Sequence, residues 1–524
     1  MKNNIRAAKG CSGFGAVSIF ALLAAIPQMA IAQDNTIEAK GETVVITGLR
    51  GSLTKSIKIK KENASIVEVI SAEEIGKLPD SSIAESLARL PGIAGQRVNG
   101  DVQVINLRGT SPDFTVTTFN GRLQGSLGDG RGVEIDQYPS ELINGVVVYK
   151  TPDASVAGQG LSGTVDLRSI RPLSQAGKSI VINVRADTSD MDELNPEAKK
   201  WGGRATLSYV NQFMDNKLGV AFGLAYSDTT RQTQHQKLWN WRPASTGNSG
   251  ILPGKTTAEQ ASLMPTGFEI RALSNHKVRT GFMGVIEYQP NDNSHTTADL
   301  YYSKYKQDEY LRGIEMLSEW GVDGFSVPSG TISEVGGSKF LSQYVLAGGY
   351  PILNNQVHAR DDSVLSGGIN HKFKSRNWDM EVDASYSKAE GDATNVQIIA
   401  GYGANRTGDT LNIGIGLDDF SSIDPGLNYA DASKIYLGDN APWGGWGQEG
   451  FRQLPHIEDT YAGLDFKAKT SLEDTFLSSL FGSFELGVNF SSHEKIKSST
   501  DEDLCLKSAV ASTGIGQDGG NQCV

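Results

Sequence analysis

The feature of this sequence that most restricts its fold is an alternation of apolar and polar residues that recurs from about residue 178 onward. In the stretch NWDMEVDASYS, residues 377–387, every second residue from Trp378 to Tyr386 is apolar, and the residues between them are polar. Successive side chains of a β-strand point to opposite faces, so the pattern predicts a strand with one apolar and one polar face. Nine segments show it, near residues 178–187, 203–212, 217–228, 279–290, 295–306, 364–374, 377–388, 457–469 and 480–492.

Two fold classes contain such strands, the soluble β-sandwich and the transmembrane β-barrel. The sandwich buries its apolar faces, whereas the barrel turns them outward to lipid. The connections favour the barrel, because short links at 213–216, 291–293 and 375–376 alternate with links on the order of 50 to 70 residues, as periplasmic turns alternate with external loops in outer-membrane barrels. Four tyrosines also stand near strand ends, where an interfacial aromatic girdle is expected: Tyr226, Tyr288, Tyr302 and Tyr386.

The expected fold is therefore an antiparallel transmembrane β-barrel over residues 178–524, with long extracellular loops, but an incomplete one. Bacterial single-chain barrels have an even number of strands, and an open sheet edge in lipid costs several kcal/mol for each unpaired backbone group. Nine strands do not meet these requirements. We interpret the chain as the N-terminal part of a longer protein, and the alternative is a truncated receptor that does not transport.

Residues 1–32 have the parts of a secretory signal peptide. Lys2, Arg6 and Lys9 give a positive start, residues 16–26 are apolar, and Ala30-Ile31-Ala32 is a small-residue cleavage site. Cleavage is predicted before Gln33. An uncleaved membrane anchor is the alternative, although the apolar run is short for a membrane span.

A polar arm, residues 33–60, follows the signal and contains the β-branched stretch ETVVITG. An exposed segment of high β-propensity is an aggregation hazard unless it has a partner to pair with. Such a segment can add itself as a strand to the sheet edge of another protein. The residues of this expected docking stretch are Glu42, Thr43, Val44, Val45, Ile46, Thr47 and Gly48. The alternative is that Val44–Ile46 form the first strand of the next domain.

Residues 61–173 are predicted to form a compact mixed α/β domain. A short strand at 66–70 leads to Ser71, a plausible helix N-cap, and a second helix is expected over 82–90 before Pro91-Gly92. Strands are also expected at 102–109, around Val146–Val148 and at 164–168. The G-x-G-x-x-G motif at 158–163 is followed by a strand instead of the helix that a dinucleotide site requires.

Neither an enzyme nor a nucleic-acid-binding protein is expected. We find no nucleophile elbow, no H-E-x-x-H motif and no metal-ligand spacing, so no catalytic residue, metal site or cofactor is predicted. The net charge of −12 argues against nucleic acid as a partner. Cys505 and Cys523 are predicted to form a disulfide in an exported chain, with free thiols or pairing to a cysteine beyond this chain as alternatives.

Five of the seven tryptophans fall in the predicted external loops, where exposed aromatic residues usually form contact surfaces. These candidate ligand-binding residues are Trp239, Trp241, Trp320, Trp443 and Trp446. Stacking on the apolar faces of sugars is one use, and packing within the loops is the alternative. An anionic ferric siderophore would instead favour basic loop residues, and four are present: Arg231, Lys237, Arg242 and Arg271.

Several segments together closely resemble the TonB-dependent receptors, specifically the Caulobacter-type group. They are ETVVITG (42–48), KLPDSSIAESLARLPGI (77–93), INLRG (105–109), FNGR (119–122), YPSELINGVVVYKTPDA (138–154) and GQGLSGTVDLRSIRP (158–172). The resemblance implies a plug domain inside a 22-stranded barrel in the outer membrane of a Gram-negative bacterium. The chain departs from the family in ending after about nine of the expected 22 strands.

The resemblance also implies a mechanism. ETVVITG would be the TonB box, through which TonB, and indirectly ExbB and ExbD, energise import. The Caulobacter-type group is associated with oligosaccharide uptake, with siderophore uptake as the competing function. We expect Arg108, with Gly109 after it, to form an ionic latch within the plug or between plug and barrel, with Asp113, Glu134 or Asp136 as counter-ion. The alternative is a surface arginine at a strand end.

Overall fold

The structure is a computed structural model. The residues that it describes are 56–61, 63, 65–71, 83–98, 101–151, 153, 154, 156, 160–244, 252–317, 325–403, 407–417, 419–438, 450–472 and 480–504. The chain divides into two units, Met1–Gly48 and Leu49–Val524, and all described residues belong to the second. The predicted signal peptide and the stretch 42–48 therefore lie outside the described residues. Within the described residues, no helix is long and apolar enough to cross a membrane.

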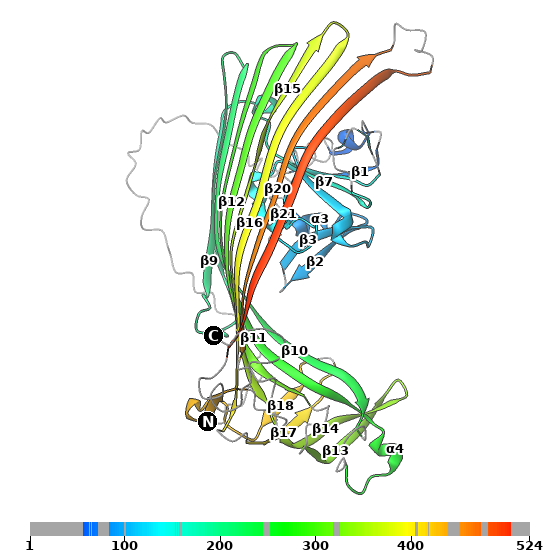
Figure 1. The fold of residues 1–524 in the computed structure, drawn as a ribbon, viewed down its shortest axis with the longest axis vertical. Coiled ribbons are helices and arrows are strands. Elements are labelled where there is room, and N and C mark those ends of the chain that lie inside the picture. The colour runs from blue at the N-terminus through cyan, green and yellow to red at the C-terminus, as the bar shows by residue number, and fades with distance from the viewer. Residues whose placement is uncertain are drawn as a thin grey trace, which may run out of the picture. The chain divides into compact units, whose positions relative to one another are not determined.

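Nine strands follow one another as antiparallel neighbours in a single sheet (Figure 1). They are β8 (Ser179–Thr188), β9 (Trp201–Phe213), β10 (Leu218–Pro243), β11 (Leu263–Asn291), β12 (Ser294–Leu317), β15 (Ile352–Ser375), β16 (Trp378–Tyr402), β20 (Gly450–Ser471) and β21 (Ser483–Leu504). Each of the nine strands predicted from the alternation is present. The three short links are also present, and Met214, Asp215, Asn216 and Arg376 take positive φ angles in two of them.

The apolar faces of these strands are exposed, and this distinguishes the two fold classes left open by the sequence. On β10, Phe222, Leu224 and Tyr226 are 36%, 44% and 46% exposed, whereas Ala221 and Ala225, which alternate with them, are buried. The same pattern continues across the other strands, with Ile182, Ile286, Tyr288, Leu300, Tyr302, Ile369, Tyr386, Leu464 and Phe490 exposed. A soluble sandwich would bury this face, so the sheet has the polarity of a barrel wall.

The opposite face, the plug face, carries small residues where the preceding domain approaches closely. A Cβ added at Gly223 would lie 2.5 Å from Leu142, and one added at Gly281 would lie 2.7 Å from Pro139. Leu142 and Pro139 belong to the domain before the sheet. The alternation of bulky and small residues along β10 therefore serves both lipid exposure and close packing.

The strands are longer than the alternation predicted. β10 has 26 residues and β11 has 29, and the two remain paired up to Pro243 and Leu263. The predicted long loop after residue 228 is thus mostly a continued hairpin. Residues 228–237, DTTRQTQHQK, are polar on both faces, so no alternation of apolar and polar residues predicts a strand there. Backbone hydrogen bonds between β10 and β11 continue the strand through this part.

The segments between the long strands form a second cluster of short elements beside the ends of β10 and β11 (Figure 1). These elements are α4 (Thr257–Gln260), β13 (Ser326–Val335), β14 (Ser338–Gly349), β17 (Asp409–Gly414), β18 (Ser422–Pro425), η5 (Ala432–Lys434) and β19 (Ile435–Leu437). Of these elements, β13, β14 and β17 share a hydrophobic core in which Val327, Leu341 and Leu346 are fully buried, whereas β19 pairs with β16. The predicted external loops are therefore folded, at least in part, around a core of their own.

The domain before the sheet is mixed α/β, as predicted. Its five-stranded sheet has the order β1-β6-β7-β4-β5, and the two-stranded hairpin β2-β3 and the short helix α3 accompany it. The elements are β1 (Val67–Ser71), α3 (Ile83–Leu87), β2 (Ile93–Val98), β3 (Asp101–Leu107), η1 (Pro112–Phe114), β4 (Thr115–Phe119), β5 (Arg122–Leu123), η2 (Ile135–Gln137), η3 (Ser140–Leu142), β6 (Gly145–Tyr149), β7 (Gly163–Arg168) and η4 (Pro172–Ser174). The glycine motif at 158–163 does lead into a strand, β7.

Candidate functional site

Arg122 joins the mixed domain to the long sheet through the buried carboxylate of Asp299 and the partly buried carboxylate of Asp383. The hairpin turn between β4 and β5 is built by Asn120 and Gly121, both at positive φ, and it delivers Arg122 to the plug face. Its Nη1 donates to both carboxylate oxygens of Asp299 on β12, at 2.8 and 2.7 Å. Its Nε and Nη2 donate to the two oxygens of Asp383 on β16, at 2.8 and 2.9 Å.

These ion pairs are held in place by their surroundings. Only 5% of the Arg122 side chain and 1% of the Asp299 side chain are exposed. Gly368 leaves room for the guanidinium, since a Cβ there would lie 2.7 Å from Arg122 Cζ. Burial lowers the pKa of Arg122, but the hydrogen bond and charge of Asp383 and the charge of Asp299 outweigh it and raise the pKa overall. The guanidinium therefore stays charged, and removing one partner would leave a buried charge uncompensated.

The predicted latch, Arg108, lies elsewhere. It is an exposed residue with φ 57° in the turn after β3, and its backbone N–H donates to Gly92 O at 2.8 Å. Gly109 follows it at φ 70°. No ion pair of Arg108 is present among the described residues. The suggested counter-ion Asp113 accepts the backbone N–H of Arg131 instead, at 2.7 Å.

Sequence reasoning missed Arg122, although two signals for it were present. FNGR ends in an arginine directly after an Asn-Gly turn, so its side chain has a fixed direction. The polar face of NWDMEVDASYS offers Asp383 and other carboxylates to the interior of the sheet. The sequence does not show the strand register that brings Arg122 and these carboxylates together.

A polar cavity of about 800 Å³ borders the Arg122 ion pairs. The mixed domain lines it with residues such as Asn120 and Arg168, and the sheet lines it with residues such as Glu287 and Lys372. The interface between the two parts is thus incompletely packed on this side.

On another side of the interface, three aromatic rings stack. The ring centroids of Tyr138 and Tyr301 are 5.0 Å apart, and those of Phe119 and Tyr301 are 5.5 Å apart. Tyr301 comes from β12, and its hydroxyl donates to the backbone oxygen of Gln137 at 2.7 Å. All three rings are buried, so they add apolar contact to the ionic contact at Arg122.

A glycine-rich loop, residues 124–131, is held by one lysine of the sheet. Lys495 on β21 donates to the backbone oxygens of Gly128 and Gly130, each at 2.7 Å, and to that of Ser126 at 3.3 Å. Glu134 closes the other side of the loop by accepting the N–H of Leu127 at 2.8 Å. Burial raises the pKa of Glu134 to about 7.

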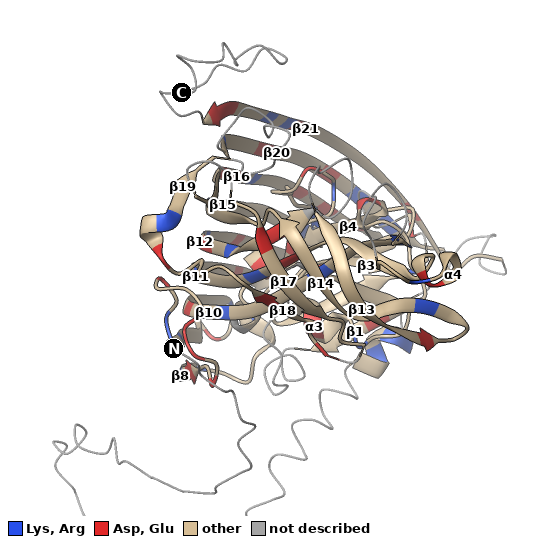
Figure 2. Cartoon of the chain, turned by 90° about the horizontal axis from the view of Figure 1, so that it is seen from below, with Lys and Arg blue, Asp and Glu red and all other residues tan. Residues whose placement is uncertain are grey.

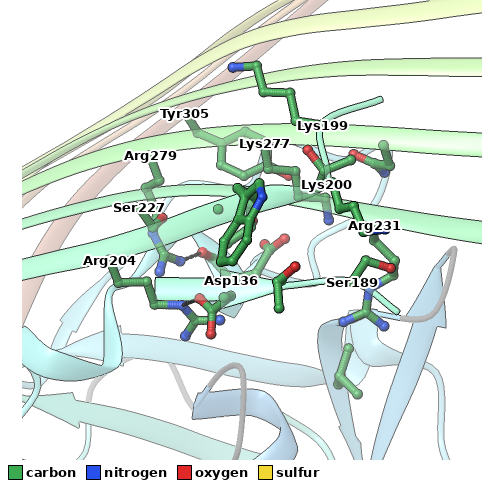
Figure 3. A pocket seen from close by; sticks show the side chains of 18 residues that line it. Asp136, Ser189, Lys199, Lys200, Arg204, Ser227, Arg231, Lys277, Arg279 and Tyr305 are labelled. Carbon is green, nitrogen blue, oxygen red and sulfur yellow. Dashed lines mark hydrogen bonds and ion pairs between the residues drawn. The ribbon is translucent and has the colours of Figure 1, made fainter. Parts of the chain in front are cut away.

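A basic cavity of about 250 Å³ lies between the mixed domain and strands β8 to β12 (Figure 3). We call it the cationic pocket. Its charged lining residues are Lys199, Lys200, Arg204, Arg231, Lys277, Arg279, Asp136 and Asp187, and Trp201 and Tyr305 are its aromatic residues. Along the rest of the strands, acidic and basic residues are interspersed (Figure 2). Of the four basic residues suggested for a siderophore, Arg231 lies in this pocket, whereas Arg271 is paired with Glu269 and Glu315.

The structure describes two of the five candidate tryptophans. Trp239 covers the backbone of Gly267, where an added Cβ would lie 2.4 Å from the indole. Trp241 is 38% exposed and meets Phe340 of β14 edge-on, with centroids 6.2 Å apart. Both therefore contribute to packing of the outer elements, and Trp241 also presents surface. Trp320, Trp443 and Trp446, and both cysteines, Cys505 and Cys523, lie outside the described residues.

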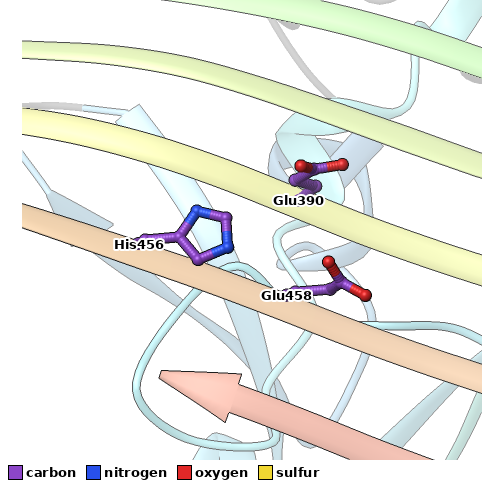
Figure 4. A group of neighbouring side chains, drawn as sticks. All are labelled: Glu390, His456 and Glu458. Carbon is purple, nitrogen blue, oxygen red and sulfur yellow. The ribbon is translucent and has the colours of Figure 1, made fainter. Parts of the chain in front are cut away.

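Among the residues that the structure describes, Glu390, His456 and Glu458 have ligand atoms close enough together for a metal ion (Figure 4). Each member already has a partner. Lys388 Nζ lies 3.0 Å from Glu390 and 3.1 Å from Glu458, and His456 Nδ1 lies 2.8 Å from Asp392. An ammonium group between the two glutamates supplies the positive charge that a metal would bring, so the arrangement is that of a surface ion-pair network.

Comparison with known proteins identifies the mixed domain. Residues 59–165 match the family described as TonB-dependent Receptor Plug Domain. Solved structures with some similarity include a mutant of the ferric enterobactin receptor PfeA from Pseudomonas aeruginosa, with 10% identity over 84% of this chain and 72% of that chain and a TM-score of 0.33. Another is the ferric preacinetobactin receptor BauA from Acinetobacter baumannii, with 12% identity over 84% of this chain and 60% of that chain and a TM-score of 0.34.

Identities of 10–12% and TM-scores of 0.33–0.34 do not identify a protein by themselves. The identification rests on the match of residues 59–165 to the plug domain family. In this chain the plug domain is bonded to one face of a long antiparallel sheet whose other face is apolar and exposed. On these grounds residues 59–165 of this protein are a TonB-dependent receptor plug domain, followed in the chain by a long antiparallel sheet.

Proposed function

We propose that this protein imports a large extracellular nutrient across the outer membrane, driven from the periplasm by TonB acting on the stretch 42–48. The proposal is based on one arrangement: Arg122 holds the plug against the polar face of the sheet. The other face of that sheet is apolar and exposed, as in a strand wall that contacts lipid. A wall of this kind encloses a path for solutes, and the plug closes it. Transport then requires that the contacts between plug and sheet be loosened.

The Arg122 ion pairs explain why work must be supplied. Breaking a buried pair on one side only costs about 3–5 kcal/mol. The outer membrane has no ATP, so the work has to come from a partner that reaches the plug from the periplasmic side. A β-branched stretch such as residues 42–48 is the kind of segment that a partner can bind by strand addition. ExbB and ExbD would act indirectly, behind TonB.

For the substrate we propose an oligosaccharide, in line with the resemblance to the Caulobacter-type group. The exposed Trp241 beside Phe340 offers an aromatic surface in the outer elements, which suits the apolar face of a sugar. A ferric siderophore is the second candidate. The cationic pocket supports it, because a negatively charged chelate would be attracted there.

The test is uptake by cells that carry the complete gene, with labelled oligosaccharides and labelled ferric siderophores supplied in parallel. Deletion of Thr43–Thr47 is expected to abolish uptake without reducing the amount of protein in the outer membrane. Deletion of Asn35–Ala39, five residues of the same arm, is the matched control and should leave uptake intact. Undiminished uptake after the Thr43–Thr47 deletion would refute the coupling role.

A further inference from the structure

We infer that Lys304 and Lys306 of β12 form a binding site for the phosphate headgroup of a lipid that surrounds the protein. The inference goes beyond the proposed import function, because it concerns the lipid outside the wall and not the solute inside it. The two lysines line neither the cationic pocket nor the polar cavity beside Arg122. They belong to the face of the sheet whose apolar residues are exposed.

The alternation along β12 places both lysines on that face. Successive side chains of a strand point to opposite faces. Tyr302 is part of the exposed apolar face, whereas Ser303 and Tyr305 are buried on the plug face. Lys304 and Lys306 therefore continue the row of Tyr302, and 45% and 62% of their side chains are exposed.

The position of the lysines along the strand is that of lipid headgroups. β12 begins at Ser294, directly after a short link, and the stretch from Ser294 to Tyr302 has the length of a membrane-spanning strand, roughly 9–11 residues. Aromatic residues such as Tyr302 are typical of the border between hydrocarbon and headgroups. The next two side chains of the row, those of Lys304 and Lys306, thus reach the headgroup zone on the side of the long connections.

Two ammonium groups share a single carboxylate at this site. Lys304 Nζ lies 2.8 Å from Oδ1 of Asp361 on β15, and Lys306 Nζ lies 3.4 Å from Oδ2. Both lysines can therefore reach one anionic group at the same time, and the three side chains together keep one positive charge. Asp308, the next residue of the row, stands opposite His276 in the ladder. Exposed ion pairs contribute at most about 1 kcal/mol, so a phosphate can bind beside Asp361 or replace it.

The strip of the sheet that contains the lysines is bounded on both sides. Farther along β12, the segment between β8 and β9 folds over the same face. Asn195 of that segment donates to the Oγ of Ser274 at 2.9 Å, and Arg312 donates to both carboxylate oxygens of Glu197 at 2.7 and 2.6 Å. In the other direction lies the apolar row. A lipid whose acyl chains lie against the apolar row can therefore place its headgroup in the strip.

A lysine at the corresponding place on β16 has the opposite balance of charge. Lys388 stands two residues beyond Tyr386, and its Nζ lies 3.0 Å from Glu390 and 3.1 Å from Glu458. Two carboxylates thus share one ammonium group. An anionic headgroup is repelled by these carboxylates and should bind at the lysine pair of β12 instead.

The test is lipid binding by the full-length protein in detergent, measured by native mass spectrometry. The probes are phosphatidic acid and phosphatidylcholine with the same acyl chains, so that only the headgroup differs. We expect the protein to retain phosphatidic acid in preference to phosphatidylcholine. Lys304→Gln and Lys306→Gln should each reduce this preference about fivefold, the effect of one charge near an anionic lipid.

Two further variants separate the site from general effects. Asp361→Asn should increase the preference, because it removes the competing carboxylate, and a variant that failed to fold would not show such an increase. Lys388→Gln is the matched control and should change the preference little. An equal loss in Lys388→Gln, unchanged preference in both variants of the lysine pair, or equal binding of the two lipids by the parent protein would overturn the inference.

Inorganic phosphate, added as a competitor, distinguishes a lipid site from a plain anion site. It carries the same charged group but has no acyl chains to lie against the apolar row. We therefore expect phosphatidic acid to remain bound when inorganic phosphate is present at a comparable concentration. Displacement of the lipid under these conditions would also overturn the inference.

Discussion

Arg122 of the plug and Asp299 of β12 are joined by two hydrogen bonds of 2.8 and 2.7 Å, although 177 residues separate them in the sequence. Asp383 of β16 completes the arrangement from a further strand. One side chain thus ties the plug to two strands that are not sequence neighbours. This contact is the part of the plug interface whose loss should be felt most strongly.

Replacing Arg122 with glutamine is expected to loosen the plug without unfolding the sheet. Two carboxylates would be left without their cation, at a cost of about 3–5 kcal/mol. Hydrogen exchange of the β4–β5 amides, Thr115–Leu123, should accelerate, while exchange in the β15–β16 ladder changes little. Arg376→Gln, in an exposed turn, is the control. Equal protection of β4–β5 in Arg122→Gln and in the control would show that Arg122 does not hold the plug.

Glu134 should make the plug more stable at acidic than at alkaline pH. Its pKa is raised to about 7, chiefly by burial, so the folded protein holds a proton that the unfolded chain releases at lower pH. The contribution is fully present below the ordinary pKa of glutamate, and it is lost as the pH rises through about 7. The protection of the Gly125–Arg131 amides, which is their exchange rate relative to the intrinsic rate at the same pH, should therefore fall between pH 5 and 8.

Glu134→Gln should abolish this pH dependence, because the amide keeps the acceptor for Leu127 N–H and does not titrate. Glu259→Gln, at the exposed capping box of α4, provides a control whose titration lies far below this range. A pH profile that Glu134→Gln shares with the parent protein would assign the effect to another group.

Lys495→Met should release the glycine-rich loop. Its ammonium donates hydrogen bonds to the backbone oxygens of Ser126, Gly128 and Gly130. The variant would remove this charged donor, and each well-formed bond of this kind contributes about 1.5–3 kcal/mol to stability. Lys497→Met is a matched control on the same strand, because Lys497 pairs with the exposed Asp129 and an exposed pair contributes at most about 1 kcal/mol. Protease cleavage within 124–131 should increase for the first variant, and equal cleavage of both would contradict the role of Lys495.

Leu224→Arg tests whether the exposed apolar face meets lipid. Leu224 is 44% exposed on β10 and stands in the apolar row with Phe222 and Tyr226. Arginine near the bilayer midplane destabilises a barrel by about 2–4 kcal/mol. Gln234→Arg, on the same face but beyond the apolar row, should have little effect. Unfolding in lipid vesicles measures both, and equal stability of the two variants would argue against a lipid-facing surface.

The sequence by itself determined the strands. The side-chain period of a strand is local, so Trp378 to Tyr386 or Leu218 to Tyr226 suffices to locate a strand and to identify its two faces. It did not determine the length of the strands beyond residue 228, because residues that are polar on both faces leave no period to read. There, pairing between β10 and β11 extends each strand.

Only the tertiary structure decided which residues act together. Arg108 lies in the turn after β3 and Arg122 directly after the Asn120-Gly121 turn, and their neighbours in the sequence do not show which of the two meets carboxylates of the sheet. The register of β12 and β16 places Asp299 and Asp383 opposite Arg122 and leaves Arg108 in solvent. The cationic pocket arises in the same way, from residues of β9, β10 and β11 that are unremarkable singly. The interaction of two charges depends on the distance between them in space. The sequence indicates that distance only for residues of the same strand, and the distance between residues of different strands depends on the tertiary structure.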